Sequence, residues 1–185
     1  MKVKWISWNP WHGCTRISPG CKNCYVYTMD QLYGKDASIV FKTKAFQLPI
    51  ALNRTGGFAI PSGCHIFTCG SSDFFMKRQT LGVKRLMISC ACAQISIFSL
   101  SLSELTGFTL PCPATGGEGY DHVTIGCTCE DQQQADYRLP LFFDTPIRHR
   151  VIVRQPLIRA YSFAALSSIW KGTRSSRWWR IRSSS

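Results

Sequence analysis

The chain has no uninterrupted apolar run of the roughly 18 residues that a membrane-spanning helix needs, so no transmembrane segment is predicted. Its first residues also lack the apolar core and cleavage site of a signal peptide. With 185 residues and 45% hydrophobic content, the sequence is typical of one globular domain with a buried core. We therefore expect a cytoplasmic protein whose thiols stay reduced.

Acidic residues are scarce, because ten Asp and Glu stand against 22 Lys and Arg, for a formal net charge of +12. No acidic residue follows Asp144, although many basic ones do. Such an excess is typical of proteins that bind nucleic acid or another anionic surface. Trp170, Trp178 and Trp179 lie among these arginines and favour base stacking with phosphate neutralisation. A basic nucleic-acid-binding module is therefore one alternative for the function.

Cysteine, by contrast, is abundant, with ten in the chain. In a reducing compartment, clustered cysteines more often bind metal or do redox work than form disulfides. Cys14, Cys21 and Cys24 follow a C-x6-C-x2-C spacing on a loop that prolines and glycines interrupt. These residues break any helix or strand, so the three thiols can turn toward one point. Three converging thiolates suit a soft metal centre that keeps one coordination position open.

The residues alone leave the kind of centre open. An iron–sulfur cluster is one interpretation, and a zinc ion with His12 or Cys64 as fourth ligand is another. Unliganded structural thiols are the third. His12 is expected to pack or hydrogen-bond rather than to ligate. Cys127 and Cys129 are expected to point to opposite faces of their strand, as are Cys64 and Cys69, so we expect neither pair to chelate a metal.

Short apolar runs alternate with polar loops and helical patterns, which indicates a parallel α/β fold with its site at the carboxyl ends of the strands. Asp73, at such an end, is expected to contact a polar ligand or to cap the following helix. Tyr25 is expected to pack on a cofactor or in the core, and Glu130 and Asp131 to be solvated rather than to bind cofactor amines. The predicted strands are 3–8, 64–69, 122–130 and 149–154, and the predicted helices are 25–33 and 132–138, the second stopping before Pro140.

The segments Trp8-Asn-Pro, Gly13-Cys14 and Pro19-Gly20-Cys21-x-x-Cys24-Tyr25 resemble a phage and bacterial family, domain of unknown function 5131, whose three-Cys motif is related to radical-SAM proteins. The resemblance covers residues 1 to about 77 and about 118 to 158. It implies a partial or full (β/α) barrel of radical-SAM type with the cysteine loop after the first strand. It also implies a [4Fe–4S] cluster on the three cysteines, whose fourth iron binds S-adenosylmethionine. The substrate is not named, and a partner protein from a neighbouring gene is compatible with this reading.

Two stretches do not resemble that family, residues 78–117 and 159–185. Within the first, serine alternates with apolar residues from Ile95 on, which can be read as a half-buried strand, but a second reading follows from the codons. Codons permitted for Gln94–Phe108, read one nucleotide earlier, can encode the strand and Thr-Lys-Arg end that the family has there. Codons for Thr173–Arg182, read one nucleotide later, can encode its Gly-Gly-Glu-Ser-Gly strand end. We therefore expect a frame-shifted, truncated and inactive copy. Its single domain, residues 1–158, would be a degraded barrel with an irregular insert at 78–117, followed by an aberrant basic tail at 159–185.

Overall fold

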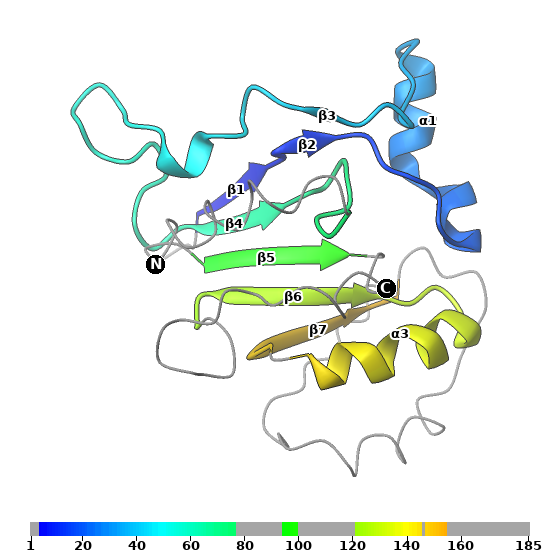
Figure 1. Ribbon diagram of the computed structural model, residues 1–185. Coiled ribbons are helices and arrows are strands. Elements are labelled where there is room, and N and C mark those ends of the chain that lie inside the picture. The colour runs from blue at the N-terminus through cyan, green and yellow to red at the C-terminus, as the bar shows by residue number, and fades with distance from the viewer. Residues whose placement is uncertain (1–3, 77–93, 100–120, 146, 155–185) are drawn as a thin grey trace.

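The computed structural model describes residues 4–76, 94–99, 121–145 and 147–154 (Figure 1). Its main feature is a sheet of five parallel strands, and each strand lies beside the one that precedes it in that sheet along the chain. The predicted α/β class is therefore confirmed. Within the described residues the sheet does not close into a barrel, and its first and last strands are its two edges. The strands are, in order, β1 (Trp5–Trp8), β4 (His65–Thr68), β5 (Gln94–Ser99), β6 (Val123–Thr128) and β7 (His149–Val153).

The apolar core joins this sheet to the helix α3 (Gln132–Asp144). Ala135, Leu139 and Phe142 recur at helical spacing, and all three are buried in the same cluster as Ile125 of β6 and Ile152 of β7. Parallel strands covered in this way contain near-continuous apolar residues rather than a strict alternation. The four strands predicted from short apolar runs are confirmed. Of these, β6 is buried at nearly every position, whereas β4 alternates between buried and half-buried residues.

The end of α3 differs from the prediction, because the helix continues through Pro140 to Asp144. A proline inside a helix removes one backbone hydrogen bond and strains the turn before it, at a cost of about 3 kcal/mol. Leu139 and Phe142 flank Pro140, and both are fully buried. Burying two large apolar side chains gains roughly 1.5–3 kcal/mol each, which exceeds the cost of the proline.

The middle of the sheet also differs from the prediction. Part of the segment 78–117, expected to be irregular, forms β5, which pairs with β4 on one side and β6 on the other. Its sequence, Gln-Ile-Ser-Ile-Phe-Ser, contains two isoleucines and a phenylalanine, residue types that favour a strand in this reading frame too. The rest of 78–117 and all of 159–185 lie outside the described residues.

A smaller unit next to the edge strand β1 positions the cysteine loop (Figure 1). The strands β2 (Trp11–His12) and β3 (Phe41–Lys42) pair antiparallel. Between them come a 3₁₀ helix (Pro19–Asn23) and the helix α1 (Tyr25–Leu32), and a second 3₁₀ helix (Leu48–Ile50) follows β3. No helix in the described part of the chain is both long and apolar enough to cross a membrane.

Candidate metal centre

The cysteine loop starts from a glycine that no other residue can replace without strain. Gly13 has φ +90, and a Cβ there would lie 2.4 Å from the carbonyl oxygen of Ile39. Its N–H donates to Ser71 O at 3.0 Å, and the next N–H, of Cys14, donates to Ala37 O at 2.8 Å. The first cysteine is therefore clamped between the loop after β4 and the segment before β3.

The second and third cysteines belong to one short turn. Cys21 lies within the 3₁₀ helix and is 4% exposed, and its Sγ accepts from the Ile17 N–H at 3.5 Å. Ser18 Oγ lies 3.6 Å from the same sulfur. Cys24 is the N-cap residue of α1, where the positive end of the helix dipole favours a negatively charged ligand.

Cys21, Cys24 and Asp73 lie close enough to Cys14 to affect the ionisation of its thiol. The pKa of its thiol is raised to about 12, mainly because burial disfavours the thiolate, and then by the negative charges of Asp73, Cys21 and Cys24. A hydrogen bond from the Asp73 backbone opposes this rise. The three cysteines and Asp73 thus share one electrostatic neighbourhood. A metal bound there would have to displace the Cys14 proton, which its own positive charge would favour.

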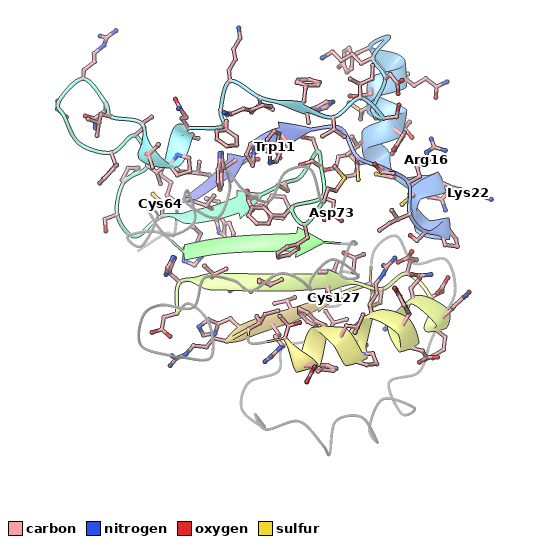
Figure 2. The ribbon with its side chains drawn as sticks, viewed as in Figure 1. Trp11, Arg16, Lys22, Cys64, Asp73 and Cys127 are labelled. Carbon is pink, nitrogen blue, oxygen red and sulfur yellow. The ribbon has the colours of Figure 1, made fainter. Side chains whose placement is uncertain are left out.

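Asp73 reaches this place because of the turn after β4. Cys69 has φ 60, a left-handed conformation that is uncommon for a non-glycine residue, and the chain reverses there. Asp73 is 3% exposed, and its Oδ1 accepts from the Phe75 N–H at 3.0 Å. Asp73 therefore holds a local turn, and no helix for it to cap begins in residues 73–76. It lies on the side of the sheet nearest the cysteine loop (Figure 2).

Tyr25 is not a core residue, so that half of its prediction is wrong. Its side chain is 63% exposed, and its hydroxyl donates to the carbonyl of Gly70. Burial of the hydroxyl region and the charge of Cys24 raise the pKa of Tyr25. The side chain therefore connects the start of α1 to the loop that carries Asp73.

Neither expected fourth ligand for zinc is available at the cysteine loop: His12 is paired with Asp30, and Cys64 lies at the other end of the sheet. His12 Nε2 lies 2.7 Å from Asp30 Oδ2, which confirms the hydrogen-bonding role predicted for this histidine. Cys64 is buried just before β4, whereas the cysteine loop follows β1. Because β1 and β4 are parallel and in register, these are opposite ends of the sheet, as Figure 2 shows for Cys64 and Asp73.

No three His, Cys, Asp or Glu side chains among the described residues are arranged to hold a single metal ion. A cluster makes a different demand, because its thiolates bond to different irons and need not meet at one atom. The donor set fits such a cluster in kind: three thiols of one loop, one buried and two partly buried.

Sequence reasoning missed a buried ion pair beside this loop. Glu130, expected to be solvated, is 0% exposed, and its Oε2 accepts from Arg138 Nη1 at 2.8 Å. The same Nη1 donates to Thr128 O at 2.6 Å. Asp131 instead caps α3 by accepting from the Gln134 N–H at 2.8 Å. The available signal was an acid at a strand end followed by an arginine within the apolar stripe of the next helix.

The expectation that Cys127 and Cys129 point to opposite faces of their strand is wrong. The sulfurs of Cys127 and Cys129 lie 3.5 Å apart, and both residues are fully buried. Residues two apart in a strand share a face of the sheet, so these two thiols lie on the same side. Burial raises the pKa of the Cys127 thiol well above its usual value, and Cys129 raises it further.

A family model described as "Protein of unknown function (DUF5131)" matches residues 1–175. The chain belongs to this family. The match confirms the family inferred from the cysteine block, and its range also includes 78–117 and most of the basic tail. No curated protein and no solved structure matches the chain.

Proposed function

We propose that this DUF5131 protein is a radical-SAM-like iron–sulfur protein in which Cys14, Cys21 and Cys24 hold a [4Fe–4S] cluster. The observation that carries the proposal is the shared neighbourhood of these thiols and Asp73 at one end of a parallel sheet. When bound, such a cluster supplies one-electron chemistry and one iron without a protein ligand, open to an external molecule. S-adenosylmethionine is the molecule we propose for that position.

The chain's own residues have distinct roles in this proposal. Gly13 sets the loop conformation, and the N-terminus of α1 at Cys24 stabilises the negative charge of a thiolate-bound cluster. Asp73 offers a buried carboxylate beside the thiols for a ligand's amine or hydroxyl. The exposed Tyr25 ring, held by Gly70, borders the same loop and can pack on a bound ligand.

The strand order supports the finer fold that we propose, a partial (β/α) barrel of radical-SAM type. In such barrels each parallel strand lies beside the preceding one, and active sites form at the carboxyl ends. The five described strands follow that order, and the cysteine loop and Asp73 both follow carboxyl ends. Zinc is the weaker alternative, because His12 is paired with Asp30 and Cys64 lies at the other end of the sheet.

Cluster binding is tested by metal analysis. We expect anaerobically purified protein to be brown and to contain iron and acid-labile sulfide. Cys14→Ala, Cys21→Ala and Cys24→Ala should each lose both, because each removes one of the three thiolates. Atomic absorption and a sulfide assay measure the two contents.

The matched control is Cys64→Ala, which removes a buried thiol at the opposite end of the sheet and should leave iron and sulfide unchanged. Zinc bound without sulfide would refute the proposal. Adding S-adenosylmethionine to the reduced protein should alter the electron paramagnetic resonance spectrum of the cluster, and an unchanged spectrum would remove that cofactor from the proposal.

A further inference from the structure

The carboxylate of Glu130 lies directly against the cysteine turn. A Cβ added to Gly20 would lie 3.0 Å from Cγ, Cδ and Oε1 of Glu130. Gly20 precedes Cys21 and is itself buried, so this contact is made by the backbone that carries the second thiol. The turn therefore approaches the end of β6 only because residue 20 has no side chain.

The two oxygens of that carboxylate differ. Oε2 is held by Arg138 of α3, which also donates to Thr128 O at the end of β6. Oε1 is buried and has no hydrogen-bond partner in the described residues. A buried acceptor without a partner costs free energy, and an apolar residue at 130 would avoid that cost. The contact with Gly20 accounts for where this oxygen points.

We propose that Glu130 is a positioning residue of the metal centre. Arg138 fixes the carboxylate, and the carboxylate fixes the Gly20–Cys21 turn, so α3 and β6 set the position of the Cys21 thiol. We call this link, from Arg138 through Glu130 to the Gly20–Cys21 turn, the brace. Its role in holding a metal ligand rests on the proposed function, whereas its effect on Cys21 can be measured in metal-free protein.

The test is a double-mutant cycle with Gly20→Ala and Glu130→Asp. The alanine Cβ pushes on the carboxylate, and the aspartate draws the carboxylate back by one methylene. Each single variant should raise the alkylation rate of Cys21 by N-ethylmaleimide severalfold in metal-free protein, as followed by peptide mass spectrometry. The double variant should return toward the wild-type rate, because the added methyl group fills the space that the shorter acid leaves.

In the control Gly57→Ala, the nearest atoms to the added methyl group belong to the Asn53 side chain, at 3.4 Å or more, so Cys21 should be unaffected. General destabilisation would also raise the alkylation rates of the buried Cys64 and Cys127, whereas loss of the brace raises the alkylation rate of Cys21 alone. If Gly20→Ala does not fold, Glu130→Asp by itself decides the matter through the same comparison.

Three outcomes contradict the brace: unchanged Cys21 rates in the single variants, additive rates in the double variant, or equal increases at all buried thiols. Iron and sulfide are measured separately on wild-type protein. If Cys21 rates rise as expected but the wild-type protein binds no iron, the positioning role of Glu130 stands and the proposed function is refuted. If the protein binds iron but Cys21 rates do not change, the proposed function stands and the positioning role is refuted.

Discussion

Burial raises the pKa values of Cys14 and Cys69 to about 12, from an ordinary value of 9.0. In the unfolded chain both thiols would ionise at lower pH than in the folded protein. Their contribution to stability is therefore complete below about pH 9 and is lost as the pH rises from about 9 to about 12. We expect the urea midpoint of metal-free protein to fall between about pH 8 and about pH 11.

Cys14→Ala and Cys69→Ala should each flatten this pH dependence, because alanine does not ionise. A midpoint that falls as steeply in the double variant as in the wild type would show that other groups cause the loss.

The role of a single residue can be predicted from the sequence only where it depends on its neighbours along the chain. Spacing and loop breakers were enough to select Cys14, Cys21 and Cys24. The pair of Glu130 with Arg138 was missed, because local sequence alone does not show that α3 lies over the end of β6. An acid judged by its neighbours in sequence looks solvated, whereas the packing of a later helix buries it completely.

Elements were predictable where one pattern governed them. The strands β1, β4, β6 and β7 and the helix α1 follow from short apolar runs and from Gly34 after the helix. The order of the strands in the sheet could not be read from those runs, because it depends on contacts between distant segments. The end of α3 was missed because tertiary packing outweighed the local effect of Pro140.

Replacing that proline should stabilise the protein. Pro140→Ala restores an N–H that can donate to the carbonyl of Asp136, and it removes the ring from the preceding turn. We expect the free energy of unfolding to rise by about 1–3 kcal/mol in urea titrations. Gln133→Ala, an exposed position of the same helix, is the control and should change it little. A loss of stability in Pro140→Ala would mean that the ring packs favourably.

For the whole molecule, the net charge of +12 remains the main argument for nucleic-acid binding. If the basic tail carries such a function, affinity for DNA or RNA should fall steeply with salt, and deletion of 159–185 should abolish it. We expect weak binding with a shallow salt slope, because the proposed iron–sulfur function does not involve the tail. Filter binding at several salt concentrations measures this slope, and a steep tail-dependent slope would favour the alternative.

The frame-shift hypothesis makes a prediction about the gene rather than the protein. The genomic DNA should encode the family's Thr-Lys-Arg strand end one nucleotide out of frame near residues 94–108, and its Gly-Gly-Glu-Ser-Gly phrase near 173–182. A chain assembled from two frames would carry residues other than the family's in these stretches, and we expect it to be inactive even though β5 still pairs with β4 and β6. Sequencing decides this, and a gene with neither phrase would refute the hypothesis.

The parallel sheet has one further consequence. Because all five strands of the main sheet run the same way, Cys64 lies at one end of that sheet and Asp73 at the other. If the proposed function is right, changes at the Cys64 end should alter stability alone, and changes at the Asp73 end should alter what the protein binds. An engineer could therefore strengthen this scaffold from one side and redesign its chemistry from the other, in separate experiments.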